Sequence, residues 1–172
     1  MANLLGITLG PRARTVAIAH IVGNNKAPEL LNDGATIARR VIEIPDPFEN
    51  MGAMVIRQLA WKVGEVAGDG TTTAAVIAQA ILDEATKCIA AGANAMRIKR
   101  GLERALPVVL EALKQQARPV ETEEQVAQVA TISSGDPVVG RYFGEIFDIL
   151  GPEAIVLVQD SQGTTVEREY VE

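Results

Sequence analysis

The residues best suited to chemistry form one short run, Gly68-Asp69-Gly70-Thr71-Thr72-Thr73. The two glycines permit a sharp turn and let a ligand approach the main chain closely. The threonines begin a helical pattern, whose first N–H groups lack acceptors within the helix and therefore favour an anion. Asp69 would repel a phosphate group unless a cation lay between them, and a carboxylate beside a phosphate is a common arrangement for Mg²⁺.

A simpler interpretation is that Asp69 caps the following helix and the glycines only form a turn. Short motifs match by chance, so the six residues alone favour this simpler interpretation. An ordinary P-loop enzyme is excluded, because no Gly-Lys-Ser or Gly-Lys-Thr follows any glycine-rich turn.

Helical patterns flank this run on both sides. Upstream, apolar residues recur at helical spacing, which predicts a helix from Phe48 to Gly68 with a buried stripe of Phe48, Met51, Val55, Leu59, Val63 and Val66. Met54 and Trp61 are also interpreted as core residues. Downstream, residues 74–82 are apolar nearly all round, which predicts a helix buried on several sides at the centre of a bundle. Cys88, near the end of that helix, is expected to be a small buried hydrophobe.

The remaining elements follow from caps, turns and periodicity. Asp33 is a candidate N-cap for a short helix over residues 35–41, and Pro107 should kink a long helix over residues 96–117. The other predicted elements are a short helix in residues 3–8, strands at 14–22 and 27–31 around a Gly23-Asn24-Asn25 turn, a helix that opens with the capping box Thr122–Gln125, a helix from Asp136 to Leu150, and strands at 154–158 and 165–171.

The predicted fold is therefore mainly α: a multihelical bundle with a small β-hairpin, followed by a small α+β segment. We place the domain boundary at Arg118-Pro119, which gives domains of residues 1–118 and 119–172. The single histidine, His20, has no second histidine with which to bind a metal, so a surface or half-buried strand position is expected for it.

Composition restricts the function further. The 172 residues are 48% hydrophobic and only 3% aromatic, which suits close helix packing. The net charge of −6 argues against a general nucleic-acid binder. One cysteine, no secretory signal and no long apolar run predict a cytoplasmic protein with no membrane association.

The motifs resemble those of the group I chaperonins, the 60-kDa heat-shock class. The resemblance is carried by Thr8-Leu9-Gly10-Pro11, Phe48-Glu49-Asn50-Met51-Gly52-Ala53, Gly68–Thr73 with the apolar run after it, Ile98-Lys99-Arg100-Gly101-Leu102 and Val129-Ala130-Thr131-Ile132-Ser133. It implies that residues 1–118 are the first half of an equatorial, nucleotide-binding domain. Residues 119–172 would be the ascending half of an intermediate domain.

The resemblance also implies a binding site for ATP or ADP with Mg²⁺, and K⁺ as a second cation. Asp69 matches the metal ligand, and Asp33, with Gly34 in the same acidic turn, would lie beside the phosphates and assist hydrolysis. The remaining residues that match the nucleotide-binding turns are Thr8, Leu9, Gly10, Pro11, Gly68, Gly70, Thr71, Thr72 and Thr73. The family usually has a lysine where this chain has Asn32, which weakens the charge balance near the phosphates.

Two functions from different classes follow. The first is an ATP-binding chaperonin subunit, or a truncated piece of one, that forms homo-oligomers or associates with complementary chaperonin segments. Non-native polypeptides and a co-chaperonin would be partners only as part of a complete subunit. The second is a non-catalytic helical interaction protein that keeps the fold without the ATPase. The resemblance implies that the carboxylate orienting the attacking water lies beyond Glu172, so we expect no chaperonin-like turnover from this chain alone.

Overall fold

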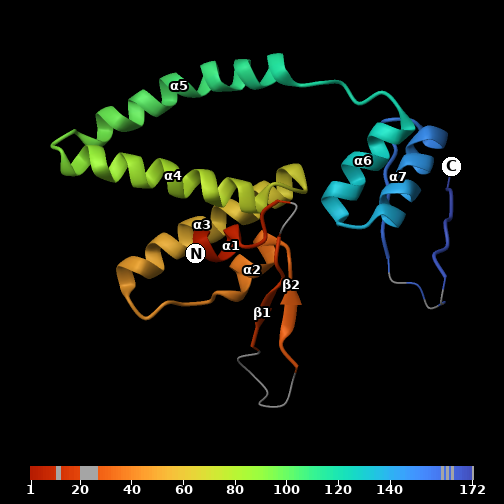
Figure 1. Cartoon of the computed structure of the whole chain (residues 1–172). Helices are drawn as coiled ribbons and strands as arrows, with labels where there is room; N and C mark the ends of the chain where they lie inside the picture. The colour runs from red at the N-terminus through yellow and green to blue at the C-terminus, as the bar shows by residue number, and fades with distance from the viewer. Residues whose placement is uncertain (11–12, 20–26, 160, 162, 164, 172) are drawn as a thin grey trace. The chain divides into compact units, whose positions relative to one another are not determined.

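The computed structural model describes residues 1–10, 13–19, 27–159, 161, 163 and 165–171. The chain divides into two compact units, residues 1–115 and 116–172, each of which is described by itself. Among the described residues there are seven helices and one two-stranded sheet (Figure 1). The mainly helical fold class is therefore confirmed.

The first unit contains both strands and most of the helices. Its elements are α1 (Ala2–Gly6), β1 (Val16–Ile18), β2 (Glu29–Leu31), α2 (Gly34–Arg40), α3 (Pro47–Ala67), α4 (Thr71–Ala90) and α5 (Ala95–Gln116). Side-chain caps set the starts of α2 and α3, because Asp33 and Asp46 each accept hydrogen bonds from the first helical N–H groups. Helix α3 ends at Gly68, which has a φ of 73° that glycine adopts without strain.

The small sheet lies beside α2. Strands β1 and β2 are antiparallel, with Val16 opposite Leu31 and Ile18 opposite Glu29. A bidentate ion pair connects the helix to the sheet: Arg40, at the end of α2, donates to both carboxylate oxygens of Glu29 in β2, each at 2.7 Å. Among the described residues, both strands begin two residues later than predicted, at Val16 and Glu29. His20 and the predicted Gly23-Asn24-Asn25 turn lie outside the described residues.

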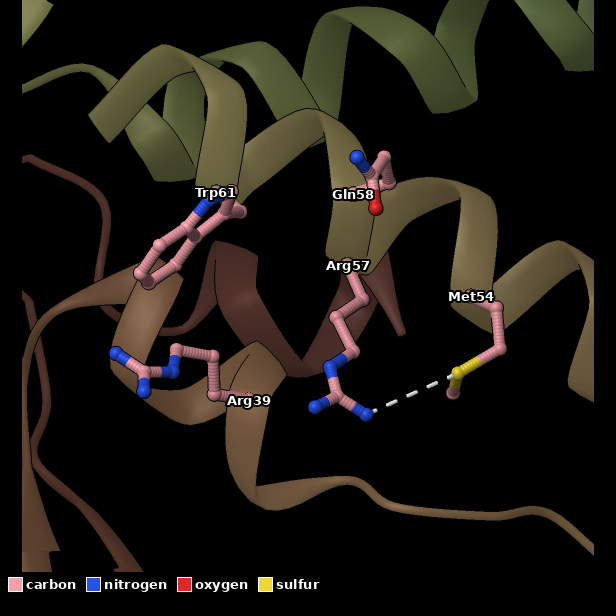
Figure 2. A pocket seen from close by; sticks show the side chains of 5 residues that line it. All are labelled: Arg39, Met54, Arg57, Gln58 and Trp61. Atoms are coloured by element: carbon pink, nitrogen blue, oxygen red, sulfur yellow. Dashed lines mark hydrogen bonds between the residues drawn. The ribbon is translucent and has the colours of Figure 1, made fainter. Parts of the chain in front are cut away.

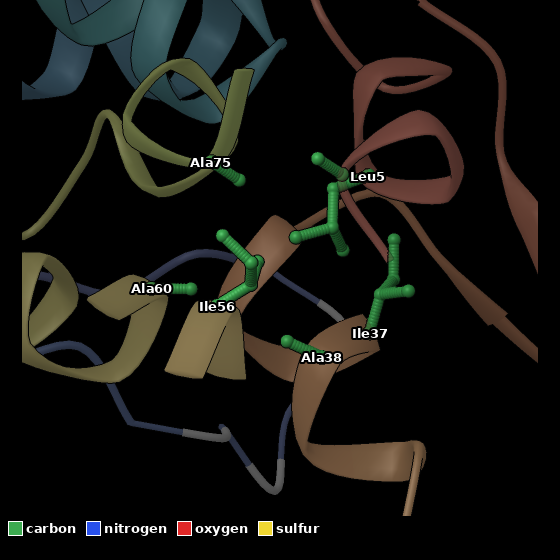
Figure 3. Close-up of a cluster of buried hydrophobic side chains, with 7 residues drawn as sticks. Leu5, Ile37, Ala38, Ile56, Ala60 and Ala75 are labelled. Atoms are coloured by element: carbon green, nitrogen blue, oxygen red, sulfur yellow. The ribbon is translucent and has the colours of Figure 1, made fainter. Parts of the chain in front are cut away.

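A small hydrophobic core brings four helices together (Figure 3). Leu5 of α1 and Ile37 of α2 are fully buried, and Ile56 and Ala60 of α3 and Ala75 of α4 pack around them. The core residues labelled in the figure are Leu5, Ile37, Ala38, Ile56, Ala60 and Ala75. Because α1, the start of α2 and the start of α4 share this core, the turns at those helix ends are held near one another.

Several burial predictions were wrong. Phe48, Met51 and Val55 are exposed, and α3 instead buries the neighbouring face that carries Ala53, Ile56 and Ala60. Helix α4 buries only Thr71, Thr72 and Ala75, all near its start. The physical reason is that the described residues provide neighbours for only the first part of α4 and for one face of α3. Cys88, predicted to be buried, is exposed for the same reason.

The second unit is a helical hairpin of α6 (Glu123–Ser134) and α7 (Pro137–Leu150). The predicted capping box is confirmed: the Thr122 hydroxyl accepts from the N–H of Gln125, and the Gln125 side chain accepts from the N–H of Thr122. The predicted start of the next helix at Asp136 is confirmed as well: Asp136 is the N-cap of α7, and Pro137 occupies its first position.

The two strands predicted at residues 154–158 and 165–171 are not formed by the described residues there. Ile155, Leu157 and Val158 are all at least 80% exposed. An isolated two-stranded ribbon is marginal without a third strand or a helix against it, and β-branched composition alone does not supply that neighbour. No helix among the described residues has the length and apolar character needed to cross a membrane.

Candidate functional site

The turn between α3 and α4 has the geometry that its glycines suggest. Gly68 and Gly70 have φ values of 73° and 82°, a region that other residues rarely adopt. Gly70 is the N-cap of α4, and no side chain caps this helix. Asp69 therefore does not cap α4 in the usual sense, because its carboxylate accepts only from the adjacent N–H of Gly70, at 2.6 Å. Within the described part of the chain, the first N–H groups of α4 have no acceptor and can donate to a ligand.

The end of α1 meets the start of α4 through two threonines. The Oγ1 atoms of Thr8 and Thr72 lie 3.0 Å apart, and the Thr8 hydroxyl also donates to the carbonyl oxygen of Leu5 at 2.8 Å. A hydroxyl has one hydrogen, so Thr72 is the donor and Thr8 the acceptor in their shared bond. Residues 64 positions apart in the sequence are thus joined directly.

Asp33 links the start of α2 to the same turn. Its carboxylate accepts from the Thr71 hydroxyl at 3.2 Å and from the Thr36 hydroxyl at 2.7 Å. It also accepts from the N–H groups of Ala35 and Thr36. Partial burial raises the pKa of Asp33, but the hydrogen bonds from Thr36, Ala35 and Thr71 outweigh it and hold the pKa below its ordinary value. Asp33 is therefore a stable anion at neutral pH.

Gly34 allows this close approach. A Cβ atom at Gly34 would lie 2.9 Å from the Thr71 hydroxyl oxygen, 3.0 Å from the Thr72 nitrogen, and closer still to the Thr72 hydroxyl oxygen. Only glycine permits α2 to begin directly against α4. Thr71 and Thr72 are buried by this contact, although both are polar.

The other predicted site residues lie at the margin of this group. Leu9, Gly10 and Thr73 are exposed, and Gly10 has a φ of 80°. Pro11 lies outside the described residues. The structure therefore brings Thr8, Asp33, Gly34, Thr71 and Thr72 into contact, with the Gly68-Asp69-Gly70 turn next to them in the chain. We call these eight residues the threonine–aspartate site.

The donors and acceptors of the threonine–aspartate site fit a cation together with an anion. The hydroxyls of Thr71 and Thr72 are buried and donate within the protein, to Asp33 and Thr8, so they hold the turns of the site together. Two carboxylates, Asp33 and Asp69, add acceptors, while the start of α4 offers backbone donors. The described residues contain no group of three or more ligating side chains that would enclose a metal. This composition suits Mg²⁺, which keeps several waters and enters with a phosphate.

Two open clefts lie on the surface formed by α2 and α3. The larger has a volume of about 430 Å³ and is lined by Arg39, Met54, Arg57, Gln58 and Trp61 (Figure 2). The smaller, of about 290 Å³, is lined by Asp33, Ala35, Thr36, Arg39, Trp61, Gly64 and Glu65. Sequence reasoning missed Thr36, which orients Asp33, and the pairing of Arg39 with Trp61. Thr36 could have been identified from its position, because a threonine three residues after a capping aspartate can donate its hydroxyl hydrogen to that aspartate.

Comparison with known proteins identifies the family of the chain. The model of the TCP-1/cpn60 chaperonin family matches residues 1–168. Among solved structures, the chain is similar to the chaperonin gp146 from the bacteriophage EL 2 (Pseudomonas aeruginosa), crystallised in the presence of ATP-BeFx, with 26% sequence identity and a TM-score of 0.65. The match covers 88% of this chain but only 26% of that chaperonin.

Proposed function

Because the chain belongs to the TCP-1/cpn60 chaperonin family, we propose that its first unit binds ATP or ADP with Mg²⁺ at the threonine–aspartate site. The observation that supports this most is the joining of three distant turns, through the Thr8–Thr72 and Asp33–Thr71 hydrogen bonds. A merely structural turn after α3 would need neither the buried threonines nor a glycine at the start of α2.

In this proposal each group has a distinct part. The N–H groups at the start of α4 donate to the phosphates, where the helix dipole also favours negative charge. Asp69 holds the Mg²⁺, which balances the negative charge of the phosphates. Thr8, Leu9 and Gly10, in the turn after α1, would approach the phosphates, as the resemblance implies. A K⁺ ion is also implied by the resemblance.

Asp33 is better suited to charge balance than to proton abstraction. A general base works best when its pKa is near the working pH, and the hydrogen bonds to Asp33 hold its pKa below the ordinary carboxyl value. We therefore propose that Asp33 orients water or cation at this site and contributes weakly to hydrolysis. Folding of non-native polypeptides with a co-chaperonin is proposed only for a complete subunit, since this chain spans about a quarter of the phage chaperonin that it matches.

Calorimetric titration with ATP and ADP, with Mg²⁺ and with a chelator, tests the proposal. We expect Asp69→Ala to weaken Mg²⁺-nucleotide binding at least about tenfold, equivalent to about 1.4 kcal/mol, with little change when Mg²⁺ is absent. Asp83→Ala is the matched control, because Asp83 is an exposed carboxylate on α4 that does not belong to the threonine–aspartate site. Equal wild-type affinity with and without Mg²⁺ would contradict the assignment of Asp69.

The second candidate function, a helical interaction protein without nucleotide chemistry, is favoured by one observation. Large apolar side chains remain exposed along α4 and α5, among them Ile77, Leu82, Leu106 and Leu113. The same titration separates the two candidates, because an interaction protein that has lost the site would show no saturable heat with either nucleotide.

A further inference from the structure

The larger cleft is lined by one face of α3 and the last turn of α2. Met54, Arg57, Gln58 and Trp61 recur three and four residues apart, so they share one side of α3. Arg39, near the end of α2, lies opposite them (Figure 2). Neither Thr8 nor any of the threonines at the start of α4 is among its lining residues. The cleft is therefore separate from the threonine–aspartate site.

Two guanidinium groups face this cleft without a carboxylate partner among the described residues. Arg57 donates from Nη1 to the carbonyl oxygen of Val41 at 3.4 Å and lies near the Met54 sulfur. Arg39 stacks over the ring of Trp61, 4.5 Å from its centroid. Their neighbour Arg40, by contrast, is neutralised by Glu29. Two guanidinium groups without a carboxylate partner among the described residues thus line one cleft of a chain whose net charge is −6.

Arg39 lies over the Trp61 ring and donates no side-chain hydrogen bond among the described residues, so its N–H groups remain open. A guanidinium packs on an aromatic face through its plane and donates its N–H groups within that plane. Contact with the ring therefore orients the group without using its donors. Arg57 likewise has five N–H donors, of which the contacts to Val41 and Met54 involve one nitrogen. These are forked donors that match carboxylate and phosphate oxygens.

The remaining walls are apolar or adaptable. Met54 supplies a flexible thioether and Trp61 an aromatic surface, and Gln58 adds an amide that can either donate or accept. The volume of about 430 Å³ is within the range of small-molecule sites. The adjoining smaller cleft shares Arg39 and Trp61 but is also lined by Asp33 and Glu65. Those carboxylates would repel an anion and confine it to the Arg57 side.

We propose that the larger cleft binds a small organic anion. Arg39 and Arg57 hold its oxyanion group, and its apolar body lies against Met54 and Trp61. A phosphate ester and a carboxylic acid present the same oxygens to the two guanidiniums, so both sources fit the chemistry.

Trp61 is the only tryptophan of the chain, so its fluorescence reports directly on this cleft. The full chain is titrated with phenyl phosphate, phenylacetate and inorganic phosphate at constant ionic strength, with a chelator to keep Mg²⁺ out of the threonine–aspartate site. We expect a saturable change with phenyl phosphate or phenylacetate. Whichever of the two compounds binds more tightly shows whether the site prefers a phosphate ester or a carboxylate. Inorganic phosphate should bind at least about fivefold more weakly than that compound.

Variants assign the binding to the cleft. We expect Arg57→Gln to weaken it at least about fivefold, whereas Arg104→Gln, which removes the same charge from an exposed position on α5, should leave it unchanged. Asp69→Ala should also bind as the wild type does. Circular dichroism checks that Arg57→Gln is folded. Arg39→Gln should weaken the same binding, and calorimetry measures its affinity because the variant also alters the Trp61 fluorescence.

The proposal would be overturned by the absence of saturable binding, or by equal losses in the Arg57 and Arg104 variants, which would indicate only general charge attraction. Inorganic phosphate binding as tightly as phenyl phosphate would overturn the role of the apolar walls. Binding of an acidic peptide alone, with no response to the small anions, would also overturn it and indicate a protein-docking surface.

Discussion

At the scale of single residues, Asp33 connects helix formation to the candidate site. Its carboxylate caps α2 through the N–H groups of Ala35 and Thr36 and also accepts from the Thr71 hydroxyl of α4. All of these bonds favour the ionised carboxylate. Protonation of this one group therefore weakens both the helix cap and the contact between α2 and α4.

The stability of the first unit should depend on the ionisation of Asp33. Because its pKa in the folded protein is below the ordinary value of 3.8, its contribution is fully present above that value and is lost as the pH falls through the folded pKa. Asp33→Asn, which keeps a capping side chain, should therefore show a smaller loss of stability in acid than the wild type. Urea unfolding at neutral and acidic pH measures this difference.

The control for this pH dependence is Asp83→Asn, since Asp83 accepts no hydrogen bond among the described residues. Its acid profile should follow that of the wild type. If Asp33→Asn lost as much stability in acid as the wild type, the hydrogen bonds to Asp33 would not be present in solution.

Replacement by alanine should have opposite effects on stability at Gly34 and at Gly52. A Cβ at Gly34 would approach the backbone nitrogen of Thr72 to 3.0 Å, so Gly34→Ala should destabilise by about 1–3 kcal/mol through overpacking. No atom lies within 4 Å of a Cβ built at Gly52 inside α3, so Gly52→Ala should stabilise by about 0.5–1 kcal/mol. Thermal unfolding of both variants tests the pair, and a stabilised Gly34→Ala would refute the close packing of α2 on α4.

The sequence predicted those features of the site that depend on local backbone chemistry. The Asp33 cap and the left-handed Gly68 and Gly70 follow from rules about helix ends and turns. The contacts that connect distant turns, such as Thr8 with Thr72, depend on how α1 and α4 pack together. No pattern within either segment specifies that distance. Only the chaperonin resemblance placed those residues near one another.

At the scale of elements, α6 and α7 pack closely because α7 presents glycines to its partner. A Cβ at Gly140 would lie 2.6 Å from the Ala127 carbonyl oxygen and 2.9 Å from the Thr131 nitrogen. A Cβ at Gly144 would lie 2.9 Å from the Glu123 carbonyl oxygen. The backbones of the two helices are thus in direct contact, which larger side chains would prevent.

Gly140→Ala should therefore separate α6 from α7 and destabilise the second unit by about 1–3 kcal/mol. The matched substitution Gly101→Ala in α5 adds a Cβ with no atom within 4 Å, so it should be neutral or slightly stabilising. Hydrogen exchange of the α6 and α7 amides measures the effect on this unit separately. Unchanged protection in Gly140→Ala would contradict the close helix contact.

The ends of the helices were predicted better than their burial. Asp33, Thr122 and Asp136 mark helix starts through side-chain capping, which can be recognised from the sequence. Burial depends on whether another element covers a face. An apolar stripe shows which face of a helix could be buried, but not whether another element packs against it. Phe48 and Met51 therefore have core character in the sequence yet are exposed in the structure.

At the scale of the whole molecule, many large apolar side chains are not covered by any other described residue. Helix α5 has no buried residue at all, although Leu102, Leu106, Val109 and Leu113 recur on one side of it. Leu82 and Ile89 of α4 are also exposed. Apolar patches of this kind mark surfaces that bind other protein segments, consistent with the general tendency of the chaperonin family to form oligomers.

We therefore expect the isolated chain to form dimers or larger soluble assemblies, with α5 as a main contact. Because no residue of α5 is buried within the chain, replacing Leu106 and Leu113 with Gln should cost little folding stability but remove much of the apolar contact. Sedimentation at tens of micromolar should show wild-type association and a shift of the double variant toward monomer, with unchanged circular dichroism. The exposed pair Arg100→Gln and Arg104→Gln on the same helix controls for altered solubility. A monomeric wild type would contradict the expected association, and association that is unchanged in the double variant would exclude α5 as its main contact.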